Sequence, residues 1–118
     1  MFRSSFSQVY VFGGFTATNP PVALASLEMY DPISNTWTTK APMHIARGNP
    51  AKAVVGGFLL AIGGEVKNVY GNLSVPIGSI EFYDPTLDAW SADTATLALP
   101  RFRFSVGQSA NKYVSCAN

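Results

Sequence analysis

A repeat of about 50 residues governs this 118-residue sequence. Each copy has an apolar tetrad closed by two glycines, then a Glu-x-Tyr-Asp-Pro segment and a tryptophan. The repeated residues are Gly13-Gly14, Tyr30 and Trp37 in the first copy and Gly63-Gly64, Tyr83 and Trp90 in the second. The second copy has three extra residues between the glycines and the Glu-x-Tyr segment, where a loop can absorb them. A fixed period of this length restricts the chain to architectures in which similar units stack on one another.

Each unit is predicted to contain four short strands. The tetrads 9–12 and 59–62 are apolar at every position, which favours inner strands that are buried on both faces. Gly56-Gly57 separates two apolar runs and predicts a tight hairpin, because glycine accepts positive φ easily. Asp31-Pro32 and Asp84-Pro85 predict turns, because proline fixes φ and aspartate can accept hydrogen bonds from the following amides. Four-stranded units at this period indicate the blades of a β-propeller, so the predicted fold class is all-β.

The order of motifs also resembles a known family. In the first unit the glycines are followed by Glu28 to Trp37, then Ala41-Pro42-Met43, then Arg47. This order resembles the kelch repeat, which implies four-stranded antiparallel blades of a kelch β-propeller. The second unit departs from the pattern at 94–100, where no Ala-Pro-Met occurs and one extra residue precedes Arg101.

The repeat frame predicts domain organisation. Repeat one is expected at about residues 8–50, repeat two at about 51–103 and the start of a third at 104–118. These amount to about two blades, an incomplete propeller, since propellers typically close with about four to eight. Open blade faces expose apolar surface and strand edges, so we expect the chain to need further blades or to self-associate.

Composition excludes several classes of partner. Charged residues make up 13% of the chain, the net charge is +1, and no run of Lys or Arg occurs. A nucleic-acid or anionic-membrane partner is therefore not expected. The longest apolar run, 53–62, is also shorter than the ~20 residues of a membrane-spanning helix. The single cysteine, Cys116, cannot form an internal disulfide, which favours a reducing compartment and a cytoplasmic location.

Candidates for catalysis are few. Metal or nucleophilic sites need several convergent groups, and the chain has one histidine, His44, and one cysteine. We therefore expect no enzyme activity, no metal and no cofactor. Asp88, Asp93 and Glu65 are interpreted as solvated carboxylates without recognisable partners.

The repeated glycines and aromatic residues receive structural interpretations. The glycine pairs lack GxGxxG spacing and a following helix, so they are interpreted as sites of close backbone approach rather than phosphate loops. The tyrosines and tryptophans named above are interpreted as packing between blades.

Loops on one face are the predicted partner site. Because strands alternate in direction, the loops after the glycine pairs and the loops that lead into the next unit emerge on the same face. The resemblance implies that this face binds short peptides through side chains after the glycines and through the second basic position of an Arg-x-Arg loop. By position these residues are Phe15, Asn49, Glu65 and Arg103. Arginine favours a peptide with an acidic residue. Arg47 and Arg101 are interpreted instead as braces between neighbouring blades.

The predicted function is a non-enzymatic protein-protein interaction module that recognises a partner or substrate. By resemblance, its role would be that of an adaptor of a cullin ubiquitin ligase. Two alternatives stay open: an actin-binding or cytoskeletal kelch protein, and a fragment of a catalytic kelch propeller such as an oxidase or sugar epimerase.

Overall fold

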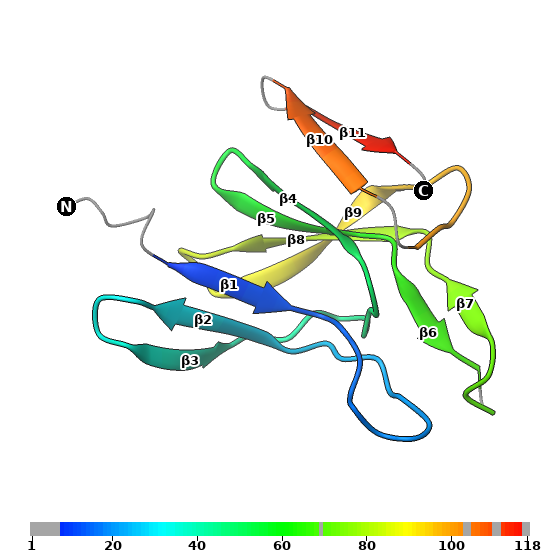
Figure 1. Cartoon of the computed structure of the whole chain (residues 1–118). Helices are drawn as coiled ribbons and strands as arrows, with labels where there is room; N and C mark the ends of the chain where they lie inside the picture. Colours follow the sequence, from blue (N-terminus) through cyan, green and yellow to red (C-terminus); the bar gives the residue numbers. More distant parts are fainter. Residues whose placement is uncertain (1–7, 69, 103–104, 110–111, 117–118) are drawn as a thin grey trace.

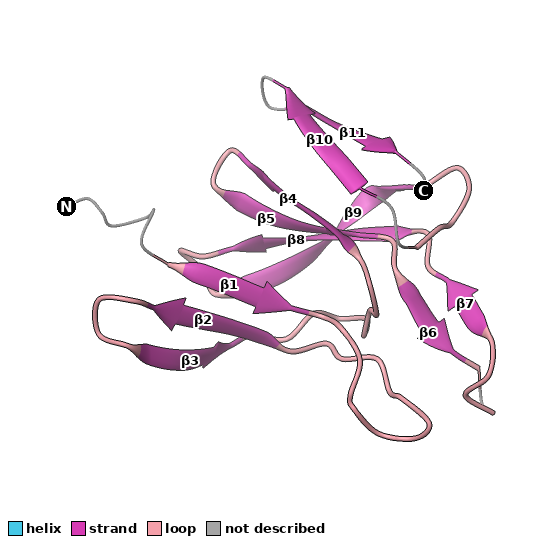
Figure 2. Ribbon diagram, viewed as in Figure 1, coloured by secondary structure: helices cyan, strands magenta, loops and turns pink. Residues whose placement is uncertain are grey.

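The computed structural model describes residues 8–68, 70–102, 105–109 and 112–116, the last two ranges by their backbone alone. The described residues form eleven β-strands and no helix, which confirms the all-β prediction (Figure 2). Accordingly, this part of the chain contains no helix suited to crossing a membrane.

The described residues form four antiparallel sheets, of which three lie next to one another (Figure 1) and the fourth is the hairpin of β6 (Glu65–Lys67) and β7 (Ser74–Pro76). The first contains β1 (Val9–Phe12), β2 (Leu27–Asp31) and β3 (Thr36–Lys40) in that order. The second is a complete four-stranded blade of β4 (Ala51–Val55), β5 (Phe58–Ile62), β8 (Ser79–Asp84) and β9 (Ala89–Thr96). The third pairs β10 (Ser105–Ser109) with β11 (Lys112–Cys116), and β10 lies along β4. The predicted antiparallel blades are confirmed, and we call the first two sheets blade 1 and blade 2.

Turn residues behave as the sequence predicts. Gly56 and Gly57 have φ of 58° and 86° and close the β4–β5 hairpin, where only glycine adopts both conformations easily. The Asp31 and Asp84 side chains each accept a hydrogen bond of 2.9 Å from the amide two residues later. Tyr30 pairs with Trp37, and Tyr83 pairs with Trp90, so the two blades share one register.

The core lies between the blades. One apolar cluster joins blade 1 to blade 2, and the other covers the opposite face of blade 2. The first contains Phe12, Leu27, Met43, Leu59, Ala61, Tyr83 and Trp90. The second contains Ala51, Ala53, Leu60, Ile62 and Ile80. Trp90 and Tyr83 therefore pack between blades, as predicted.

The prediction of a doubly buried strand at 9–12 is wrong. Val9 and Val11 are 51% and 43% exposed, whereas Leu59 and Ala61, their counterparts in β5, are 8% and 0% exposed. The two strands differ in their neighbours. β5 lies between β4 and β8 in its sheet and has a blade packed on each face, whereas β1 has only β2 beside it among the described residues. The prediction that Trp37 packs between blades is wrong for the same reason: Trp37 is 58% exposed and packs against the Tyr30 ring.

Arg47 braces the two blades, as predicted. Its guanidinium donates to the Glu81 carboxylate at 3.1 Å and to the carbonyls of Gly63 and Ser79 at 2.9 and 2.7 Å. Arg47 and Glu81 are both buried. Burial lowers the pKa of the guanidinium from its usual value, and the Glu81 carboxylate opposes that shift. Arg101 bonds within its own loop, where its Nε donates to the Leu99 carbonyl at 3.3 Å.

The interpretation of Asp88 and Asp93 as carboxylates without partners is wrong. Asp88 Oδ1 accepts hydrogen bonds from the Ala41 amide at 3.0 Å and from the Tyr83 hydroxyl at 2.7 Å. Both bonds favour the charged form, so they lower the pKa of Asp88, the Ala41 bond most strongly. Burial raises the pKa of Tyr83, with Asp88 adding to the shift. Asp93 accepts from the Ala95 amide at 3.0 Å.

Candidate partner-binding surface

Two loops from different blades meet at one end of the sheets. The loop after β3 leads through Gly48 into blade 2, and the strand after the second glycine pair, β6 (Glu65–Lys67), begins beside it. Gly48 and Glu65 exchange two backbone hydrogen bonds, each 2.8 Å long. The loops after β1 and β5 leave from this same end, opposite the β2–β3 and β4–β5 turns (Figure 1). The predicted common face therefore exists.

The glycine pairs make this meeting possible. Gly64 has φ of 107°, and a Cβ at this position would lie 2.9 Å from the Gly48 carbonyl oxygen. Its amide donates to the Arg101 carbonyl at 3.1 Å, and in the first repeat the Gly14 amide donates to the Arg47 carbonyl at 2.8 Å. Close backbone approach explains Gly64, as the sequence suggested, whereas Gly14 is explained by its φ of 100°, since a Cβ there would have no atom within 4 Å.

The buried Glu65 side chain is hydrogen-bonded to residues on both sides of this meeting point. Its side chain is fully buried, so its interpretation as a solvated carboxylate is wrong. The Asn49 amide donates to Oε2 at 3.0 Å, and the Ser74 hydroxyl donates to Oε1 at 2.5 Å. Lys67 Nζ lies 3.7 Å from Oε1. A buried carboxylate needs such donors, because an unpaired charge away from water is costly. Glu65 thus links the loop after β3 with the hairpin of β6 and β7 (Ser74–Pro76).

Lys67 and Phe15 form the more accessible part of the cluster. Lys67 Nζ donates to the Ser74 hydroxyl at 3.0 Å and lies 5.5 Å from the centre of the Phe15 ring. The Phe15 ring packs against Gly48, where any Cβ would be 2.1 Å from a ring carbon. The Lys67 side chain keeps 21% of its surface exposed. A cation and an aromatic ring are therefore presented together beside the buried Glu65.

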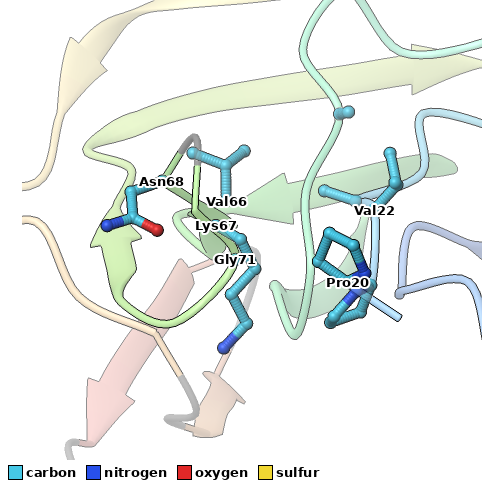
Figure 3. A pocket seen from close by; sticks show the side chains of 9 residues that line it. Pro20, Val22, Val66, Lys67, Asn68 and Gly71 are labelled. Carbon is cyan, nitrogen blue, oxygen red and sulfur yellow. The ribbon is translucent and has the colours of Figure 1, made fainter. Parts of the chain in front are cut away.

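A cleft of about 340 Å³ opens next to this cluster. It separates the loop after β1, which contains Pro20 and Val22, from β6, which contains Val66 and Lys67 (Figure 3). Pro21, Ala23, Ala46, Asn68 and Gly71 complete the lining. The walls are mostly apolar, and Lys67 is the one charged lining residue in the described part of the chain. Such a cleft suits an extended segment with apolar side chains.

The structure brings three of the four predicted partner contacts together. Phe15, Asn49 and Glu65 lie in one cluster, while Arg103 lies outside the described residues. Their role as partner contacts stays a prediction. Sequence reasoning missed Lys67 and Ser74, because the β6–β7 hairpin was taken for a loop. Alternation along β6 places Glu65 and Lys67 on one side, and Ser74 pairs with Lys67.

No metal site emerges in the described ranges, where no three His, Cys, Asp or Glu side chains are grouped to hold an ion. His44 is exposed, and its amide donates to Glu81 at 2.7 Å.

Comparisons with known proteins identify the repeat family. A family model described as "Kelch motif" matches residues 7–44. Kelch-like protein 35 of Mus musculus is 34% identical over 91% of this chain. Kelch-like ECH-associated protein 1B of Danio rerio is 29% identical over 84%, and Kelch repeat and BTB domain-containing protein 13 of Homo sapiens is 31% identical over 93%. The chain spans only 17%, 16% and 22% of the lengths of these relatives.

A solved structure is also similar. The structure titled "Structure of YjhT" superposes with a TM-score of 0.69 at 18% identity. The match covers 87% of this chain and 32% of the other. At this identity the likeness concerns the fold, and it supports the stacked-blade arrangement.

Proposed function

We propose that this chain, which is built from kelch repeats, is a non-enzymatic protein-binding module that recognises a partner peptide through the loop face. The observation that carries the proposal is the cluster of Phe15, Asn49, Glu65 and Lys67 beside an apolar cleft. Residues from two blades contribute, so the surface depends on the packed blades rather than on one loop. The proteins similar to this chain are named for the same repeat.

The proposed partner has apolar side chains and an acidic residue. Lys67 places a positive charge at the cleft, and Arg103 is the second predicted cation on this face. A carboxylate near either group would gain a charge-assisted hydrogen bond. The buried Glu65 supports the partner site indirectly, because it holds Asn49 and Ser74 in place.

A peptide selection tests the proposal. A random peptide library displayed on phage would be selected against the immobilised chain, and the selected peptides would be titrated against variants. We expect acidic peptides, with affinity about tenfold or more weaker for Lys67→Ala or Arg103→Ala, since one charge-assisted bond contributes about 1.5–3 kcal/mol. Phe15→Ala should also weaken binding by removing an apolar wall.

Variants at the opposite end of the sheets serve as controls. Ser34 and Thr86 lie in the β2–β3 and β8–β9 turns, and both are exposed. Ser34→Ala and Thr86→Ala should leave peptide affinity unchanged. If these variants lose affinity while the loop-face variants keep it, the proposed surface is wrong.

A finer proposal is the role of substrate adaptor in a cullin ubiquitin ligase, with a cytoplasmic location. One similar human protein is named for a BTB domain as well as kelch repeats, which supports an adaptor. Co-purification of a cullin with the full-length protein from the cytoplasmic fraction would test both parts. Cosedimentation with actin filaments and no bound cullin would favour the cytoskeletal alternative instead.

A further inference from the structure

The main-chain groups of β6 point alternately toward β7 and away from it, as in any antiparallel hairpin. The Gly64 carbonyl accepts a hydrogen bond from the Ile77 amide at 2.8 Å, and the Asn68 amide donates across the same hairpin at 2.9 Å. The even-numbered residues of this segment therefore face β7. The amides and carbonyls of Glu65 and Lys67 face the opposite edge, toward the cleft.

Glu65 uses this edge, whereas Lys67 does not. Glu65 exchanges two main-chain hydrogen bonds with Gly48, each 2.8 Å long. A continued ladder would place Ala46 opposite Lys67, but the chain turns away at Arg47, whose amide donates to the loop after β1 at 3.0 Å. Among residues 8–68 and 70–102, no main-chain group pairs with the Lys67 amide or carbonyl. The ladder thus stops where the cleft begins.

The wall of the cleft opposite β6 is apolar (Figure 3). It contains Pro20, Pro21 and Val22, and the Val22 side chain is 57% exposed. The prolines have no amide hydrogen, and the Val22 amide already donates to the Thr16 hydroxyl at 2.9 Å. One wall therefore presents a main-chain donor and acceptor at Lys67, and the other presents an apolar surface.

These two walls fit a β-strand better than a helix. The main-chain groups of a helix are paired with one another, so a helix would cover the Lys67 amide and carbonyl without bonding to them. Burial of unpaired polar groups is unfavourable. An extended segment has free main-chain groups along its edges and alternates its side chains between two faces. It can bond to Lys67 and also place apolar side chains against Val22.

The charge in the cleft selects the partner further. Among the described lining residues, only Lys67 carries a charge. Its Nζ donates to the Ser74 hydroxyl at 3.0 Å and lies 3.7 Å from Glu65 Oε1, and 21% of its side chain is exposed. An ammonium group has three donors, so Lys67 can also bind a carboxylate of the partner. An acidic residue directly opposite Lys67 in a paired strand would favour the pairing.

We propose that the partner at the loop face binds as an added antiparallel β-strand on the free edge of β6. An acidic residue of the partner lies opposite Lys67, and apolar residues contact Pro20 and Val22. Two new main-chain hydrogen bonds to Lys67 extend the ladder that Gly48 and Glu65 begin. This inference rests on the proposed function and specifies how the peptide binds.

Hydrogen exchange of single amides tests this mode of binding. The probe is the tightest-binding peptide from the phage selection described above, added to the isotope-labelled chain and followed by NMR. At a free peptide concentration of about ten times Kd, exchange of the Lys67 amide should slow about tenfold, because the amide is covered only in the complex. The Val66 amide is the internal control, since Val66 pairs with Val75 inside the hairpin and should be unaffected.

N-methylation of the same peptide gives a complementary readout. Each amide of the peptide is methylated in turn, which removes one donor. Alternate residues of an added strand face β6, so methylation of the residue opposite Lys67 should weaken binding about tenfold. Methylation of either neighbouring residue should have little effect.

Matched variants of the chain test the apolar wall. Val22 and Ile33 are exposed aliphatic residues, but Ile33 lies in the β2–β3 turn at the opposite end of the sheets. Val22→Ser should weaken binding about fivefold by removing apolar contact. Ile33→Ser should leave the affinity unchanged.

The outcomes separate this inference from the proposed function. Peptides that bind the loop face without slowing Lys67 exchange, or without alternation in the methylation series, would overturn the added strand and leave the proposed function standing. Failure to select any peptide would overturn both. Slower Lys67 exchange at higher protein concentration without peptide would assign the edge to a second copy of the chain, which also overturns the inference.

Discussion

The indole N–H of Trp90 donates a hydrogen bond to the main-chain carbonyl of Ala41 at 2.8 Å across the blade interface. The Ala41 amide is bound from the same side by Asp88 at 3.0 Å. Blade 2 therefore holds both polar groups of one peptide residue of blade 1. The bond between Trp90 and the Ala41 carbonyl is partly buried, and backbone groups withdrawn from water need partners, so the tryptophan acts as a hydrogen-bond donor as well as an apolar surface.

Trp90→Phe should destabilise the chain, because the Ala41 carbonyl would lose its donor inside the interface. Loss of a partner for one buried polar group costs about 1–3 kcal/mol. The matched variant is Trp37→Phe, which changes an exposed side chain of the same register and should alter stability by less than about 0.5 kcal/mol. Urea unfolding followed by circular dichroism compares the two, and equal midpoints would contradict the interface role.

Glu81→Gln should destabilise the fold more than Glu28→Gln, the equivalent change in blade 1. It leaves the buried Arg47 guanidinium without its charge partner, and breaking a buried pair costs about 3–5 kcal/mol. Glu28→Gln alters the counterpart in blade 1, which is exposed, so stability should change by less than about 0.5 kcal/mol. The measurement is the free energy of unfolding in urea. A similar loss for both variants would mean that burial of the pair does not matter.

Gly64→Ala should destabilise more than Gly56→Ala, although both glycines have positive φ. A Cβ added at Gly56 would have no atom within 4 Å, so alanine there carries only the conformational cost of about 1–2 kcal/mol. At Gly64 the new methyl group would also meet the Gly48 carbonyl at 2.9 Å. Thermal denaturation of both variants tests this order, and the reverse order would refute the close-approach explanation.

Asp88→Asn should reduce the acid sensitivity of the fold. Hydrogen bonds from Ala41 and Tyr83 keep the pKa of folded Asp88 below its usual value of 3.8. As the pH falls, the unfolded chain therefore binds this proton first. The stabilisation by Asp88 is complete above the usual pKa and is lost as the pH falls through the lower value of the folded state.

Unfolding free energies from neutral pH down to about pH 3 would show this difference. The wild-type chain should lose more stability than Asp88→Asn over the acidic part of that range. Asn35 occupies the equivalent turn of blade 1 with similar φ, so an amide fits there. Parallel pH profiles would show that the charge of Asp88 contributes nothing.

Much of the fold could be predicted from repeated residues. The glycine pairs, Asp-Pro turns and tryptophans lie at matched positions because local backbone preference and register recur in each unit. Burial could not be predicted in the same way. Val9 and Leu59 occupy equivalent positions, yet only Leu59 is covered, because burial depends on the neighbouring blade and not on the tetrad itself.

The position of the candidate site could be predicted from the sequence, but the contacts among its residues could not. Position in the repeat was enough to place Phe15, Asn49 and Glu65 on one face. The buried role of Glu65 was not foreseeable, because it depends on Ser74 in a hairpin that contains no strong turn motif before Gly71. Lys67 was missed for the same reason.

The segment Ala41–Arg47 belongs to the first repeat by sequence and to the second by its contacts. A cut at the repeat boundary would leave the Glu81 carboxylate buried without its amide and guanidinium donors. The first copy of the repeat therefore carries, at its end, the segment that attaches it to the second copy.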